Sequence, residues 1–274
     1  MLLHISHDTV YAYDAPLARS TQYLRLTPRP TRGQQLLGWT LSLPAPASVC
    51  TDAFGNTLHV LSLDGPRRQI HLLARGEVLT DDAPPLPDPQ DSLPAPLFLR
   101  DTALTRADAG LQAFAAGFAD AAREDAHAAL LQLMQALGER MPYVPGTTDV
   151  ATPAAEAFAT GRGVCQDHAQ VFVCCARLLG LPARYVSGYL AADAEHVASH
   201  AWAEVRLPAG PGAMSDGWLG YDVSNQCLAN GRHVRLAFGS DYLDACPVRG
   251  VRLGGGTETL HAQVLVKPGA ADQQ

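Results

Sequence analysis

The first 80 residues alternate apolar and polar side chains with a period of two, which is typical of half-buried β-strands. In the run at residues 5–13, for example, Ile5, Tyr11 and Tyr13 share one parity. Further strands are predicted at residues 21–27, 36–43, 57–63 and 69–79. Because proline and glycine separate these short runs, we expect residues 1–80 to form a β-rich, β-sandwich-like N-terminal domain.

The composition changes sharply at the end of this region. Six prolines fall within residues 81–96, which is typical of an extended, semi-rigid connector. We therefore predict a Pro-rich linker over residues 81–102 and a second domain over residues 103–274. Two domains also agree with the length of the chain, since 274 residues exceed a typical single domain.

Beyond the linker the apolar period becomes helical, and residues 107–122 and 125–140 are rich in Ala and Leu. After residue 180 the period returns to two. Strands are predicted at residues 183–190, 200–207, 217–223 and 260–266. Helices followed by strands predict an α+β domain, in which helices pack on an antiparallel sheet.

One predicted helix begins at a cysteine. Two glycines flank the loop before Cys165, and Val171, Cys175 and Leu178 then recur at helical spacing as far as Gly180. The unpaired N–H groups and the dipole at a helix N-terminus stabilise a negative charge, and the thiolate is the reactive form of cysteine. Cys165 is therefore placed to act as a nucleophile.

A nucleophilic cysteine needs a base, and the base needs a third group that orients it. His200 begins one predicted strand, and Asp222 lies at the end of the next. In a plain hairpin centred on the intervening loop, His200 lies directly opposite Asp222 on one face of the sheet, although a loop of this length permits a shift of two residues. With the cysteine helix packed on that face, Cys165, His200 and Asp222 form a thiolate, a base and an orienting carboxylate.

Four segments around these residues carry recognisable motifs: Gly-Arg-Gly-Val-Cys-Gln-Asp at 161–167, and residues 180–190, 199–205 and 217–222. They resemble the bacterial transglutaminase-like superfamily, a family that includes proteins assigned as cysteine proteases. Residues 7–13, 24–29 and 52–56 resemble the β-rich domain that commonly precedes its core. The resemblance implies a papain-like thiol fold with Cys165 as nucleophile, His200 as base and Asp222 as orienting group.

Charge and cysteine usage limit the classes of partner. The net charge is −7 and no basic block occurs, which argues against nucleic acid as the main partner. The N-terminus lacks the pattern of a signal peptide, and no apolar run is long enough to cross a membrane. The six cysteines lack the spacing of a disulfide framework, so we expect reduced thiols and a cytoplasmic protein.

Several residues have a plainer interpretation than catalysis. Cys165 could be a small buried hydrophobe, as free cysteines often are, and we expect Cys174 and Cys175 to be core residues. His168 lies three residues after Cys165 and could be the base or half of a Cys-x-x-His metal pair. A histidine facing solvent or a pocket is the favoured interpretation. Because no second zinc motif accompanies this pair, we expect no metal and no cofactor.

Acyl transfer also needs an oxyanion hole. The backbone N–H of Cys165 is one donor by position. Tyr143 and Gln166 are candidates for the second donor, and Trp202 is near enough to His200 to line a substrate cleft.

These residues together predict a cysteine-dependent acyl-transfer enzyme that acts on peptide, isopeptide or glutamine side-chain amides through a thioester. Hydrolysis is favoured over transamidation, since nothing marks an amine site. The alternatives are a peptide-binding module on a thiol-protease fold and a zinc protein. The expected partner is a protein or peptide substrate, and the family resemblance adds ATP-grasp-type peptide-ligating proteins of a modification pathway.

Overall fold

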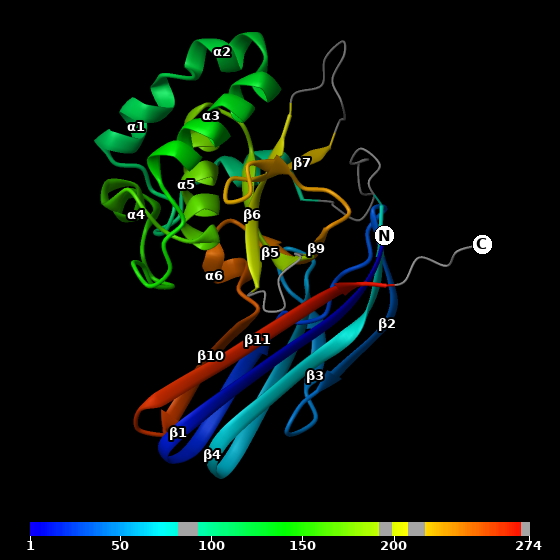
Figure 1. Cartoon of the computed structure of the whole chain (residues 1–274). Helices are drawn as coiled ribbons and strands as arrows, with labels where there is room; N and C mark the ends of the chain where they lie inside the picture. The colour runs from blue at the N-terminus through cyan, green and yellow to red at the C-terminus, as the bar shows by residue number, and fades with distance from the viewer. Residues whose placement is uncertain (82–92, 192–198, 208–216, 270–274) are drawn as a thin grey trace, which may run out of the picture.

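The computed structural model describes residues 1–81, 93–191, 199–207 and 217–269 of the chain. Over these ranges the chain forms two antiparallel sheets, and helices cover the second of them (Figure 1). The predicted fold class, α+β with a strand-rich N-terminal part, is confirmed.

The first sheet has six strands in the order β10-β1-β4-β2, with β11 also paired to β1 and β3 also paired to β4. Its strands are β1 (Leu2–Leu24), β2 (Gln34–Ser42), β3 (Ser48–Thr51), β4 (Thr57–Thr80), β10 (Val248–Gly254) and β11 (Glu258–Pro268). The predicted run 5–13 and residues 21–24 of the run 21–27 lie in β1, and the runs 57–63 and 69–79 both lie in β4. The sequence pattern divided β4 because Gly65 and Pro66 resemble a turn, whereas the strand continues through them at an irregularity in its pairing with β1.

The long strands bend, so that the first sheet closes over its own core. One half of β1 pairs with residues 69–79 of β4, and the other half pairs with residues 59–67. Trp39 of β2 pairs with Gly76 at one end of this ladder, yet its indole Nε1 donates to the carbonyl of Leu26 at the other end, at 2.9 Å. This folded sheet is the sandwich-like unit that the strand pattern predicts.

Two strands of the first sheet come from the C-terminal part of the chain. β10 and β11 pair with β1, and Figure 1 shows them running beside it. The predicted domain over residues 103–274 therefore contributes strands to the β-rich unit, because a local pattern reveals a strand but not the sheet that it joins. Part of the predicted linker, residues 82–92, lies outside the described residues. A short 3-10 helix at Ala95–Leu99 follows and buries Phe98.

The second sheet has five strands in the order β8-β7-β6-β5-β9. They are β5 (Ala183–Leu190), β6 (His200–Arg206), β7 (Trp218–Asp222), β8 (Cys227–Leu228) and β9 (His233–Gly239). The helices are α1 (Ala109–Ala116), α2 (Ala119–Glu124), α3 (Ala126–Arg140), α4 (Ala154–Thr160), α5 (Cys165–Leu178) and α6 (Tyr242–Ala245). The predicted helix at 107–122 is divided at Gly117 into α1 and α2.

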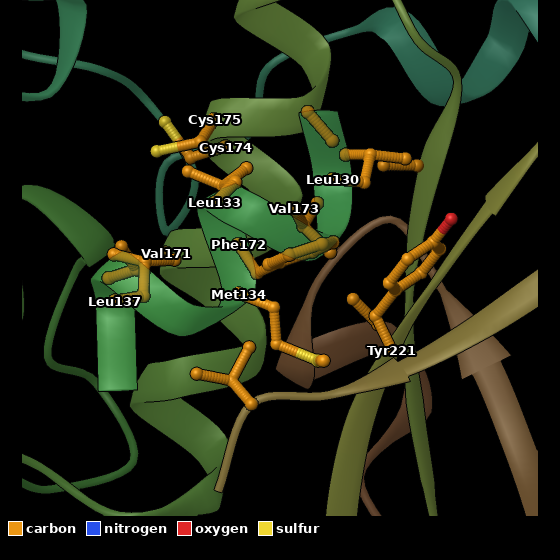
Figure 2. Close-up of a cluster of buried hydrophobic side chains, with 14 of the residues drawn as sticks. Leu130, Leu133, Met134, Leu137, Val171, Phe172, Val173, Cys174, Cys175 and Tyr221 are labelled. Atoms are coloured by element: carbon orange, nitrogen blue, oxygen red, sulfur yellow. The ribbon is translucent and has the colours of Figure 1, made fainter. Parts of the chain in front are cut away.

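Helix α5 occupies the centre of the second unit, with β5 and β6 on one side and α1, α3 and α4 around it. Its apolar stripe packs against α3 and against Tyr221 of β7, whose ring stacks on Phe172 at 5.2 Å (Figure 2). Cys174 and Cys175 are buried in this cluster, as predicted, and burial raises the pKa of the Cys174 thiol to about 12. This packing fixes the axis of the helix that begins at Cys165.

Side-chain amides join the two sheets along the open edge of β9. Asn56 donates to the carbonyl of Phe238 at 2.8 Å and accepts from its N–H at 3.0 Å. Gln34 makes the same pair of bonds with Arg235, at 2.8 and 2.7 Å. An edge strand presents unpaired backbone groups, and the two buried amides satisfy them as a further strand would.

We expect Asn56→Ala to lower the free energy of unfolding by about 2–3 kcal/mol, because buried N–H and C=O groups of β9 lose their partner. The measurement is urea unfolding followed by circular dichroism. Gln112→Ala, which alters an exposed amide on α1, is the control and should change stability by less than about 0.5 kcal/mol. Equal stability of the two variants would show that the amide pairing does not join the units.

Candidate functional site

The glycines before Cys165 have separate structural roles. Gly161 ends α4 in the left-handed conformation, with a φ of +69°. At Gly163 a Cβ atom would lie 2.6 Å from Oδ2 of Asp167, so only glycine admits that carboxylate. The loop therefore turns sharply and delivers Cys165 to the first position of α5.

Asp167 holds this loop against the first turn of α5. Its buried carboxylate accepts a hydrogen bond from the backbone N–H of Val164 at 2.8 Å and another from the hydroxyl of Thr148 at 2.6 Å. The acid in the first turn is thus a helix cap, and its contacts are with the loop.

His200 and Asp222 face each other across β6 and β7. Nε2 of His200 lies 2.7 Å from Oδ2 of Asp222, which has no exposed surface. Ala203 pairs with Tyr221, so the register is displaced by two residues from the plain hairpin and the predicted direct opposition is wrong. A shift of two keeps both side chains on one face, which is why the pair still forms.

Cys165 lies close enough to His200 to shift the pKa of the imidazole. Nε2 of His200 meets Asp222, so Nδ1 is the ring nitrogen that remains available to the thiol. Burial disfavours the imidazolium, but the hydrogen bond with Asp222 and the charges of Asp222 and Cys165 outweigh burial and raise the pKa of His200 to about 9. The structure thus joins His200 and Asp222 by a buried hydrogen bond and brings Cys165 within electrostatic reach of the imidazole.

Two residues that the sequence analysis missed complete the surroundings of Asp222. Asn225 donates to Oδ2 from its side chain at 2.7 Å and to Oδ1 from its backbone at 3.1 Å. Nε2 of His233 lies 3.1 Å from Oδ2. Burial alone would raise the pKa of Asp222, but the bonds from His200, His233 and Asn225 hold it well below its usual range.

Trp202 lies beneath the two imidazoles. Its ring stacks on His200 with centroids 6.2 Å apart and meets the edge of His233 at 5.2 Å. The side chain is only 2% exposed, so it supports the imidazoles and does not form a wall of a cleft, contrary to the expectation from its spacing. Gly188 permits this position, because a Cβ there would lie 2.7 Å from the indole.

Two family models match the chain. Residues 112–223 match the transglutaminase-like superfamily core, and residues 3–79 match the bacterial transglutaminase-like N-terminal region. Uncharacterized proteins of Mycobacterium tuberculosis and Mycobacterium bovis are 32% identical over 276 residues, covering 90% of this chain and 86% of theirs. The chain belongs to the transglutaminase-like superfamily.

Two further comparisons extend this result. A protein-glutamine gamma-glutamyltransferase of Pseudomonas aeruginosa is 29% identical to the transglutaminase-like chain over 161 residues, covering 52% of this chain and 23% of that protein. A crystal structure from Cytophaga hutchinsonii, provisionally named a cysteine protease, has a TM-score of 0.78 and 20% identity. It covers 100% of this chain and 92% of its own length, and it confirms the predicted fold.

The oxyanion candidates of this transglutaminase-like chain lie on either side of the cysteine loop. Tyr143 is 52% exposed and forms a backbone bridge with Gly163. Burial of part of the ring and the charges of Cys165 and Asp167 raise the pKa of Tyr143. Gln166 instead donates to the carbonyl of Asp149, at 3.4 Å.

His168 does not face solvent or a pocket, and this expectation is wrong. The side chain is buried, with Nδ1 2.8 Å from the Ser224 hydroxyl and Nε2 donating to the carbonyl of Met141 at 2.7 Å. Burial lowers its pKa. His168 therefore ties α5 to the loop after α3 and has no ligand geometry with Cys165.

In the described ranges, one group of side chains could hold a metal ion. His200, Asp222 and His233 offer ligand atoms that lie within 4.8 Å of one another. Within the same ranges, no helix combines the length and apolar character needed to cross a membrane.

We predict that the imidazole of His200 titrates near pH 9 and that Asp222→Asn moves its pKa down by at least one unit, because the opposing negative charge is removed. Nuclear magnetic resonance titration of ring-labelled histidine checks this result, with His200→Gln to assign the signal. A wild-type pKa at or below that of free histidine, about 6.5, would contradict the prediction.

Proposed function

We propose that the chain is a cysteine-dependent acyl-transfer enzyme that acts on amide bonds through a thioester. The observation that carries the proposal is the buried His200–Asp222 pair, with Cys165 at the start of α5 close enough to raise the pKa of the imidazole. Membership of the transglutaminase-like superfamily supports it. A thiol, an imidazole and a carboxylate in this order are the arrangement that nucleophilic catalysis by cysteine requires.

At neutral pH the raised pKa of His200 favours the imidazolium, and the proposed reaction begins from the thiolate form of Cys165. The thiolate sulfur of Cys165 attacks the amide carbonyl carbon, and the carbonyl electrons pass to its oxygen. The oxyanion then re-forms the carbonyl, the C–N bond breaks, and the proton on Nδ1 of His200 passes to the leaving amine. A thioester on Cys165 and a neutral imidazole result.

The second half of the reaction regenerates the thiol. Neutral His200 removes a proton from water, the hydroxide oxygen attacks the thioester carbonyl, and the sulfur leaves as thiolate. An amine in place of water gives transamidation. We favour hydrolysis because no described residue marks a site for a second amine, whereas water enters any partly exposed site.

The substrate in this proposal is a peptide, an isopeptide or a glutamine side-chain amide. The name of the Pseudomonas relative specifies glutamine, and this supports the side-chain amide as one of the three. We further propose a cytoplasmic pathway in which an ATP-grasp-type ligase forms the amide bond that this enzyme cleaves; cell fractionation with an antibody to this chain tests the location.

A peptide library incubated with the protein tests the chemistry. Wild-type protein should give products with the mass change of hydrolysis, and Cys165→Ala should lower their formation by at least about a thousandfold. Cys50→Ala, which alters an exposed thiol of β3, is the matched control and should retain full activity. Repeating the assay with a primary amine separates the outcomes, since incorporation of the amine would overturn the preference for hydrolysis.

Alkylation by iodoacetamide distinguishes an enzyme from a peptide-binding module. Because His200 stabilises the thiolate, Cys165 should react faster than Cys50 at about pH 6, by at least tenfold. Peptide mapping by mass spectrometry gives the two rates. A module that only binds peptide needs no activated thiol, so equal rates would favour the module.

A further inference from the structure

His233 approaches the carboxylate of Asp222 from a distant strand. It is the first residue of β9, and β9 is separated from β7 by β5 and β6 in the sheet order. The contact therefore spans the curved sheet, and Trp202 of β6 fills the space beneath it. The distance between Nε2 of His233 and Oδ2 of Asp222 therefore depends on the position of β9 in the tertiary fold.

The hydrogen bonds of His233 fix the position of its proton. The backbone N–H of Asn230 donates to Nδ1 at 3.2 Å, and a backbone N–H can only donate. The low pKa of Asp222 makes its carboxylate an acceptor, so Nε2 of His233 carries the proton and donates to Oδ2. The Asn230 side-chain oxygen lies further from Nδ1, at 3.3 Å, and accepts from Arg232.

The same bonds argue against a metal at His200, Asp222 and His233. A neutral imidazole has one acceptor nitrogen. In His233 that nitrogen is Nδ1, which already accepts from Asn230, so Nε2 has no lone pair for an ion. The cluster is arranged as a carboxylate between two N–H donors.

The first sheet holds the segment that carries His233. The hydroxyl of Thr80, at the end of β4, donates to the carbonyl of Gly231. Gln34, in β2, binds both backbone groups of Arg235. Residues on both sides of His233 are thus bonded to the six-stranded sheet.

We propose that His233 is a positioning residue: it donates to Asp222, fixes the carboxylate and thereby orients His200 toward Cys165. By holding segment 231–235, the six-stranded sheet keeps His233 in place. This inference rests on the proposed function and gives the N-terminal unit a role in the chemistry.

The pH dependence of Cys165 alkylation by iodoacetamide tests the proposal without a substrate. The titratable groups that face His200 are Cys165, His168, Asp222 and His233. His233→Phe keeps a ring but removes the donor, so the rate at about pH 6 should fall about tenfold, the effect expected when a hydrogen bond to a charged group is lost. The fall should reflect a lower pKa of His200, visible as a shift of the whole profile.

A conservative variant separates positioning from folding. The amide of His233→Gln can donate to Oδ2, so this variant should recover most of the wild-type profile. His71→Phe, at an exposed histidine of β4, is the matched control and should leave the profile unchanged. Gln34→Ala should shift the profile in the same direction as His233→Phe, whereas the exposed Gln35→Ala should not.

The outcomes distinguish this inference from the proposed function. If wild-type Cys165 reacts no faster than Cys50, the proposed function fails, and this inference fails with it. If wild-type Cys165 is reactive and His233→Phe keeps the wild-type profile, only the role of His233 is overturned. Stoichiometric zinc in purified wild-type protein, absent from both His233 variants, would also overturn it in favour of a metal site.

Discussion

A carboxylate with no exposed surface organises the site of this protein. Asp222 is buried and charged, which is costly unless every oxygen is hydrogen-bonded. His200, His233 and Asn225 provide those bonds. The need to satisfy one charge therefore brings together residues from β6, β7, β9 and the turn after β7. The position of the imidazole next to Cys165 is a consequence of that arrangement.

The parts of the site that follow local rules could be predicted from the sequence. The glycine-flanked start of α5 placed Cys165, and the period of two placed His200 and Asp222 on one face. The predicted hairpin register was wrong by two residues, because the sequence distance between Arg206 and Trp218 is too long to fix the pairing of β6 with β7. His200 and Asp222 still lie on the same face of the sheet, because successive side chains of a strand point to opposite faces. A register shift of two residues therefore leaves each side chain on its original face.

Other features could not be read from the pattern. His233 reaches Asp222 from a strand that is three places away in the sheet, and no spacing in the sequence encodes such a contact. Trp202 is two residues from His200 in the sequence and was therefore expected to line the cleft. It lies in the interior because Gly188 has no side chain in the space that the indole occupies. The sequence predicts β11 as a strand at residues 260–266 and does not predict β10, and the pairing of both with β1 depends on the whole fold.

The pairing of β1 has a consequence for biosynthesis. β1 lies between β4 and the β10–β11 pair, so one side of it has no partner until the ribosome has made residues 248–268. Contacts between residues so far apart along a chain form slowly, and the helices leave the ribosome before residues 248–268 do. During this interval the open edge of β1 can pair with strands of other nascent chains. The protein is therefore most exposed to misassembly before β10 and β11 are made.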